Sequence, residues 1–134
     1  MPDIIIHGAS SFLGKHFLRK LSSSDSPAFI LARNKSSIDE FESNPLFTIY
    51  RYEKSISEIK DISPKADSPV FIDFAWNGVF GSDRNNPEQI ITNIPMVIDS
   101  IKTAHRFNSS HWIGFGSQAE YGNLDKRITA EDAC

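Results

Sequence analysis

The stretch from His7 to Gly14, which follows three consecutive isoleucines, constrains the fold of this chain more than any other feature. Its first glycine, Gly8, allows a sharp turn after an apolar strand, and Gly14 allows the next helix to pack closely on that strand. The free amides at the start of such a helix suit the pyrophosphate of a dinucleotide. The dinucleotide fingerprint would have a glycine at position 11, where this chain has Ser11. The sequence predicts a nucleotide loop, with a tight turn that binds no ligand as the alternative.

Short apolar runs alternate with helical patterns along the chain. Five runs typical of buried strands lie at residues 4–6, 28–32, 46–50, 70–75 and 111–116. Helical patterns lie at 13–21 and 90–104, with shorter ones within 37–43 and 55–62. This alternation predicts an α/β fold, a Rossmann-like doubly wound parallel sheet with strand order 3-2-1-4-5 and helices on both faces. The loop should then lie at the carboxyl edge of the central strand.

The longest helical pattern contains a proline. Its apolar residues share one face and are Ile90, Ile94, Val97, Ile101 and Ala104. The ring of Pro95 should displace the carbonyl of Ile91, which predicts a kink or a helix start near Pro95. Asn86, just before Pro87, is a candidate cap for this helix.

Composition limits the class of protein. The 134 residues fit one domain or part of one, which we take as a single unit, 1–134. A net charge of −3 without a basic stripe excludes nucleic acid and anionic membranes as expected partners. No apolar run approaches the ~18 residues of a membrane span. The one cysteine, Cys134, favours a reducing cytoplasm, and the four scattered histidines lack the spacing of metal ligands.

The C-terminal residues carry a family resemblance. Residues 116–122, Gly-Ser-Gln-Ala-Glu-Tyr-Gly, resemble the Ser-x-x-x-Tyr-Gly segment of the extended short-chain dehydrogenase/reductase family, the NAD(P)-dependent nucleotide-sugar epimerases and dehydratases. The loop at 8–14 is similar to that family's Gly-x-x-Gly-x-x-Gly. Residues 74–76 are similar to its fourth-strand end, and Asn93 falls where its long helix carries an asparagine. The string from 75 to 122 is similar to bacterial enzymes of surface-polysaccharide pathways.

This resemblance implies roles for particular residues. Ser117 would be the catalytic hydroxyl that hydrogen-bonds the reacting sugar oxygen during hydride transfer between a sugar carbon and nicotinamide. The cofactor-binding residues it implies are Gly8, Ser10, Ser11, Phe12, Leu13, Gly14, Ala75, Trp76 and Asn93. Plainer alternatives remain, because a serine at a strand end often bonds a backbone group and the segment after Trp76 also suits a turn and a helix cap.

The family's catalytic Tyr-x-x-x-Lys pair is expected on the helix that follows a loop, which here would be residues 129–132. The chain ends at Cys134 without that pair. We therefore expect the N-terminal part of an enzyme, truncated before that helix and the substrate domain and without turnover by itself. The open apolar edge at 111–116 predicts self-association, or a missing C-terminal part.

The end of the second predicted strand bears on cofactor choice. NAD-dependent members usually carry an acidic residue there, which bonds the ribose 2′-hydroxyl. This chain has Arg33, with Lys35 close by, and a guanidinium can bind a 2′-phosphate through two hydrogen bonds. The sequence thus favours NADP, with NAD as the second choice. A solvated basic turn is the alternative.

Two rival functions stay open at this point. One is a dinucleotide-binding sensor or interaction protein of the atypical short-chain type, which keeps the loop but has no Tyr-Lys pair. The other is a structural fragment that binds no nucleotide. Ser117 favours the enzyme lineage, because a carbonyl-reducing site needs a hydroxyl at that strand end and a sensor does not.

Overall fold

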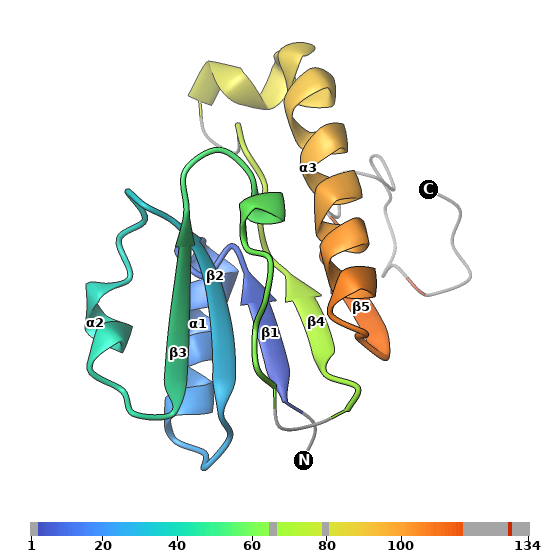
Figure 1. Cartoon of the computed structure of the whole chain (residues 1–134). Coiled ribbons are helices and arrows are strands. Elements are labelled where there is room, and N and C mark those ends of the chain that lie inside the picture. Colours follow the sequence, from blue (N-terminus) through green and yellow to red (C-terminus); the bar gives the residue numbers. More distant parts are fainter. Residues whose placement is uncertain (1–2, 65–66, 79–80, 117–128, 130–134) are drawn as a thin grey trace.

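The computed structural model describes residues 3–64, 67–78, 81–116 and 129 (Figure 1). In these residues, five parallel strands form one sheet in the order β3-β2-β1-β4-β5. The strands are β1 (Ile4–His7), β2 (Ala28–Arg33), β3 (Phe47–Tyr52), β4 (Val70–Asp73) and β5 (His111–Gly114). The predicted fold class and strand order are confirmed, with β1 at the centre of the sheet.

Helices connect successive strands and cover both faces. They are α1 (Phe12–Ser22), α2 (Asp39–Glu42) and α3 (Glu88–Arg106), with short 3-10 turns η1 (Ile56–Glu58) and η2 (Gly81–Asn85). The helices α1 and α2 contribute to the core on one face, whereas α3 and η1 contribute on the other. Figure 1 shows α1 behind the strands and α3 on the near side. The sheet is therefore the middle of three layers, as in other doubly wound folds.

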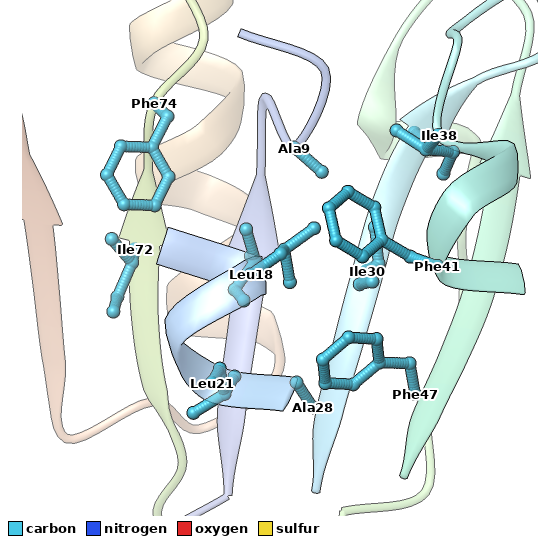
Figure 2. Packing of buried hydrophobic residues seen from close by; sticks show 12 residues of the cluster. Ala9, Leu18, Leu21, Ala28, Ile30, Ile38, Phe41, Phe47, Ile72 and Phe74 are labelled. Carbon is cyan, nitrogen blue, oxygen red and sulfur yellow. The ribbon is translucent and has the colours of Figure 1, made fainter. Parts of the chain in front are cut away.

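Alternate residues of the inner strands enter the two cores. Ile6 and Ile30 pack with Leu18 of α1 (Figure 2), whereas Ile5 and Leu31 belong to the core on the α3 side. Burial on both faces explains why these strands are continuous apolar runs in the sequence. Because all strands are parallel, their carboxyl ends lie along one edge of the sheet.

All five strands end one or two residues from the predicted positions, and hydrogen bonds explain two of these differences. β4 ends at Asp73, because Asp73 Oδ1 accepts a hydrogen bond from the Ala75 amide at 2.9 Å and so turns the chain away from the ladder. β3 continues to Tyr52 beyond the predicted end at 50, and the Tyr52 carbonyl accepts a bond from the Asn34 amide at 2.8 Å. Both adjustments occur at the carboxyl edge.

The helix α3 begins at Glu88 and continues through Pro95, so a helix start near Pro95 is wrong. The start depends on Asn86, whose Oδ1 accepts a hydrogen bond from the Glu88 amide at 2.9 Å, as expected of a cap. Pro95 and Ile91 are both exposed, so the carbonyl that loses its helical partner lies on the solvent side. Water can therefore satisfy this carbonyl, although the steric cost of the proline ring remains.

The apolar face of α3 lies mainly outside the core. Ile90, Ile94 and Ile101 are 64%, 53% and 46% exposed. The buried residues of this helix are Asn93, Ser100, Thr103 and Ala104. The helix thus turns mostly small polar side chains toward the sheet and isoleucines toward solvent. Within the described residues, no helix has the length and apolar character needed to cross a membrane.

Candidate functional site

A cleft of about 1310 Å³ lies at the carboxyl edge of the sheet. Its walls come from the loop after β1, the end of β2, the segment after β4 and the residues that follow β5. The predicted site residues that line it are Gly8, Ser10, Ser11, Phe12, Leu13, Arg33, Ala75 and Trp76. The edge beside the central strands of a doubly wound sheet is where such folds bind ligands. The structure therefore brings most of the predicted residues into one cavity.

The glycine loop needs its two glycines for different reasons. Gly8 has φ +76°, and a Cβ atom there would lie 2.3 Å from the backbone nitrogen of Ala75. A Cβ atom on Gly14 would lie 2.4 Å from the carbonyl oxygen of Gly8. The first glycine thus permits the turn and the close approach of β4, and the second permits close packing of α1 on the loop, as predicted.

Ser11 takes the place of the expected middle glycine without strain. It is the N-cap of α1, with φ −67°, and its Oγ accepts a hydrogen bond from the Gly14 amide at 3.1 Å. The amides of Phe12 and Leu13, at the first two positions of the helix, have no partner within the helix. Both residues line the cleft and are exposed. The loop therefore offers an anion the amides and positive dipole end of α1.

A chain of hydrogen bonds joins the last residues of three strands beside this loop. His7 Nδ1 lies 2.9 Å from Asp73 Oδ1, and His7 Nε2 lies 2.8 Å from the Tyr52 hydroxyl. All three side chains are buried. Burial, with the nearby Asp73 adding a smaller effect, raises the pKa of Tyr52 to about 12. Tyr52 therefore stays protonated and donates to His7, whose other nitrogen donates to Asp73.

Sequence reasoning missed this trio, although each member left a signal. Each is the polar or amphipathic last residue of an observed strand, and parallel strands bring such residues together at one edge. What the sequence did not reveal is the register, which pairs His7 with Asp73 and Arg33 with Tyr52. His7 and Tyr52 both line the cleft, whereas Asp73 holds His7 from behind without lining it.

Arg33 lies at the end of β2, is exposed and lines the cleft. Ser36, which sequence reasoning did not single out, also lines it. Lys35 is exposed but is not among the lining residues. Of the basic residues predicted at this turn, the structure thus brings Arg33 to the cleft.

The segment after β4 is anchored by α3. Asn93 is 1% exposed, and its Oδ1 accepts from the Asn77 amide at 2.8 Å while its Nδ2 donates to the Asn77 carbonyl at 3.1 Å. Trp76 is half exposed, and its Nε1 donates to Gln89 Oε1 at 3.2 Å. Asn93 and Gly14 do not line the cleft. Any contribution of Asn93 to the site therefore passes through the position of Asn77.

The end of β5 closes the far side of the cleft. Phe115 and Gly116 line it, and the Phe115 ring stacks on Phe74 with centroids 4.6 Å apart. Ser117, the predicted catalytic hydroxyl, lies outside the described residues, as does Tyr121. Gly116, the residue before Ser117, is thus the last described residue that lines the cleft.

One Tyr-x-x-x-Lys spacing that sequence reasoning overlooked is present, at Tyr50 and Lys54. Tyr50 lies in β3 and packs against Phe29 at 6.4 Å between ring centroids, and Lys54 lies in the bend that follows. Four residues along an extended strand span roughly 13 Å, whereas four residues on a helix lie on one face within about 6 Å. This spacing therefore does not form the catalytic pair, which in the resembled family lies on a helix.

Comparison with protein families gives one match. Residues 4–134 match the sequence model of the NAD dependent epimerase/dehydratase family. Among curated proteins, none matches the chain. The family match covers the glycine loop, the cleft and the predicted Ser117 segment.

Solved structures give matches over nearly the whole chain. The UDP-Glc/GlcNAc 4-epimerase of Campylobacter jejuni matches with a TM-score of 0.76 and 20% identity, covering 100% of this chain and 43% of that one. The dTDP-glucose 4,6-dehydratase of Bacillus anthracis, solved with NAD, matches with a TM-score of 0.71 and 15% identity, covering 98% and 43%. MoeE5, solved with UDP-glucose and NAD, matches with a TM-score of 0.66 and 17% identity, covering 98% and 42%. The chain thus shares the fold of these proteins and spans less than half their length.

Proposed function

Because this chain belongs to the NAD dependent epimerase/dehydratase family, we propose that it forms the cofactor-binding part of a nucleotide-sugar epimerase, dehydratase or reductase. The observation that carries this proposal is the single cleft that joins the start of α1, the exposed Arg33 and the segment at Ala75 and Trp76. The cleft has room for a dinucleotide, and its residues supply hydrogen-bond donors for a phosphate group. The neighbours with the same fold include a UDP-sugar epimerase and a dTDP-glucose dehydratase.

In this proposal three regions of the cleft hold three different parts of the cofactor. The amides at the start of α1, at Phe12 and Leu13, hold the pyrophosphate. Arg33 holds the 2′-phosphate of the adenosine ribose, which makes NADP the preferred cofactor and NAD the second choice. Ala75 and Trp76 line the part of the cleft toward β5, where the nicotinamide would lie. The remaining loop residues, Gly8, Ser10, Ser11 and Gly14, shape the turn.

The bound nicotinamide would supply hydride transfer to or from a sugar carbon. This chain's own residues hold and orient the two partners and keep water away from them. The aromatic side chains of Trp76, Phe74 and Phe115 give the β5 side of the cleft an apolar surface. Ser117, one residue beyond Gly116, would donate its hydroxyl proton as a hydrogen bond to the reacting sugar oxygen.

We further place this enzyme in the cytoplasm, in bacterial surface-polysaccharide biosynthesis, with a nucleotide sugar as substrate. The resemblance of residues 75–122 to enzymes of such pathways supports this assignment. We also propose that the chain self-associates, since α3 exposes isoleucines and β5 is the last strand of the described sheet.

Titration of the purified chain with NADPH and NADH, followed by nicotinamide fluorescence, tests the proposal. We expect NADPH to bind more tightly than NADH. Arg33→Asp should weaken NADPH much more than NADH, because a charge-assisted contact is lost and a like charge replaces it. Lys20→Asp, the same charge reversal at an exposed position of α1 away from the cleft, should change neither affinity appreciably.

The outcomes separate the parts of the proposal. Equal losses of both cofactors in Arg33→Asp would reject NADP as the preferred cofactor. Absence of binding to either dinucleotide would reject the cofactor site and leave a structural role. Tight binding of a dinucleotide by a protein that turns over no nucleotide sugar would favour the sensor over the enzyme.

A further inference from the structure

The turn that follows β2, residues 33–36, is held by a side chain from the neighbouring strand. Arg51 of β3 places Nη1 at 3.1 Å from the carbonyl oxygens of Arg33 and Asn34, and at 3.4 Å from that of Ser36. Nη1 has two N–H groups for these three carbonyls, so one N–H is shared between two of them, and the rigid plane of the guanidinium fixes their direction. One side chain thus binds the backbone of three of the four turn residues.

Backbone hydrogen bonds close the same turn from within. The Ser36 amide donates to the Arg33 carbonyl at 2.9 Å, and the Asn34 amide donates to the Tyr52 carbonyl at 2.8 Å. The Arg33 carbonyl therefore accepts from both the Ser36 amide and the Arg51 guanidinium. The amides of Asn34 and Ser36, and the carbonyls of Arg33, Asn34 and Ser36, thus all have partners in one conformation.

This conformation directs the turn toward the cleft. Arg33 and Ser36 line the cleft, whereas Arg51 does not. The remaining end of the Arg51 guanidinium, Nη2, lies 2.5 Å from Glu42 Oε1, which neutralises its charge. Both terminal nitrogens of Arg51 thus contact the protein, and Arg51 does not line the cleft, so its effect on a ligand passes through the turn rather than through direct contact.

We infer that Arg51 is a positioning residue that sets the choice between dinucleotides with and without a 2′-phosphate. It does so by holding the 33–36 turn so that Arg33 and Ser36 meet that phosphate. The inference rests on the proposed NADP preference and adds the residue that produces it. A pre-formed turn binds more tightly than a loose one, because the ordering of the backbone and of the Arg33 side chain is complete before the ligand arrives.

Arg51→Gln tests the inference in the full 134-residue chain. We expect its affinity for NADPH to fall by about tenfold, because a loosened turn costs the charge-assisted interaction of Arg33 with the 2′-phosphate. Its affinity for NADH should change by less than about twofold. Arg19→Gln is a matched control, because Arg19 also pairs with a glutamate near α2, Glu40, through two hydrogen bonds, and does not line the cleft. This control should leave both affinities unchanged.

Arg51→Lys distinguishes geometry from charge. A lysine keeps the positive charge, but its single nitrogen cannot replace two nitrogens, Nη1 at the turn carbonyls and Nη2 at Glu42, in their fixed planar geometry. We expect Arg51→Lys to lose NADPH selectivity nearly as fully as Arg51→Gln. A lysine variant with full selectivity would mean that charge alone is sufficient and would overturn the inference.

A double variant and an exchange measurement complete the test. In an Arg33→Ala background, Arg51→Gln should change the ratio of NADPH to NADH affinity much less than in the parent chain, because only the contribution of Ser36 remains. In the ligand-free chain, amide hydrogen exchange over 33–36 should be faster in Arg51→Gln, with exchange over 8–14 unchanged. A selective parent chain with an equally selective Arg51→Gln variant overturns the inference alone. A parent chain that binds neither dinucleotide overturns the proposed function and the inference together.

Discussion

At the scale of residues, Tyr52 has two structural roles. Its hydroxyl completes the buried hydrogen-bond chain to His7, and its ring packs in the core beside α3. Its pKa is raised to about 12 by burial. A tyrosine in the unfolded chain ionises near 10. Below pH 10, Tyr52 is protonated in both states, and its contribution to stability is complete. Between pH 10 and 12 only the unfolded state ionises, so this contribution is lost as the pH rises.

Tyr52→Phe should therefore destabilise the chain by about 1–3 kcal/mol at pH 8, because the buried His7 Nε2 loses its partner. The difference in unfolding free energy between the parent chain and the variant should shrink as the pH rises above 10. Urea unfolding of both proteins at pH values from 8 to about 11.5 measures this difference. A difference that stays constant over this range contradicts the assignment of the buried, protonated tyrosine.

The glycine loop gives a second prediction at this scale. Gly8→Ala should cost more than about 2 kcal/mol, since Gly8 has φ +76° and its added Cβ would meet the backbone of Ala75. Ser11→Gly, which restores the family's middle glycine, should cost only a few tenths of a kcal/mol, and Ser11→Ala about 1 kcal/mol, because the hydroxyl caps α1. Thermal or urea unfolding of the three variants gives the comparison. A marked gain in stability from Ser11→Gly would show that the serine strains the loop.

At the scale of elements, α3 is unusual because polar residues fix it to the sheet. Ser100 is fully buried, and its Oγ accepts a hydrogen bond from Trp112 Nε1 of β5 at 2.9 Å. Asn93 anchors the other end of the helix to the segment after β4. Hydrogen bonds with defined partners orient a helix more specifically than apolar contacts of the same size. The position of α3 over the cleft therefore depends on a few polar pairs.

We expect Ser100→Ala to lower the unfolding free energy by about 0.5–1.5 kcal/mol, because the partly buried indole N–H of Trp112 loses its acceptor. Ile98→Ala, on the exposed face of the same helix, should cost about 0.5 kcal/mol or less, since Ile98 is 44% exposed. Chemical unfolding followed by tryptophan fluorescence reports both effects. A larger loss in Ile98→Ala than in Ser100→Ala would contradict the assignment of the inner and outer faces.

At the scale of the whole molecule, apolar surface gathers on the β5 side. The outer face of α3 exposes Ile90, Ile94 and Ile101, and Ile113 of β5 is 42% exposed. In the described sheet β5 pairs with β4 alone, so one of its edges has no partner strand there. Exposed isoleucines on a helix and an unpaired strand edge are both typical of contact sites between proteins.

The purified chain should accordingly self-associate, with an apparent mass that rises with concentration in size-exclusion chromatography with light scattering. The double variant Ile94→Lys/Ile101→Lys should shift it toward the monomer, because lysines make the outer face of α3 polar and mutually repulsive. The control Ser43→Lys/Thr48→Lys adds the same charge at exposed positions near α2 and β3 and should not. A monomer at all concentrations in the unmodified chain contradicts the proposal.

Much of this architecture follows from local patterns. Apolar runs of four to six residues between turns predict buried strands because both of their faces are covered, and the structure confirms all five and their order. The residues after Gly8 predict the loop and its place at the carboxyl edge, since a strand, a glycine turn and a helix start are encoded by neighbours in sequence. Of the kink or helix start predicted near Pro95, the start is wrong, because the helix begins at Glu88 beside its cap Asn86 and carries the proline inside it.

The sequence by itself determined the succession of strands and helices along the chain, the glycine loop and most of the residues that reach the carboxyl edge. Each of these depends on interactions within a few residues. The tertiary structure alone decided how that edge is organised. His7 meets Asp73 across 66 positions, and Arg51 reaches the turn at 33–36 from the neighbouring strand. These contacts depend on the register between strands and on which face of α3 is buried. Both are decided when distant segments pack together, where a few buried hydrogen bonds outweigh the local pattern of apolar residues.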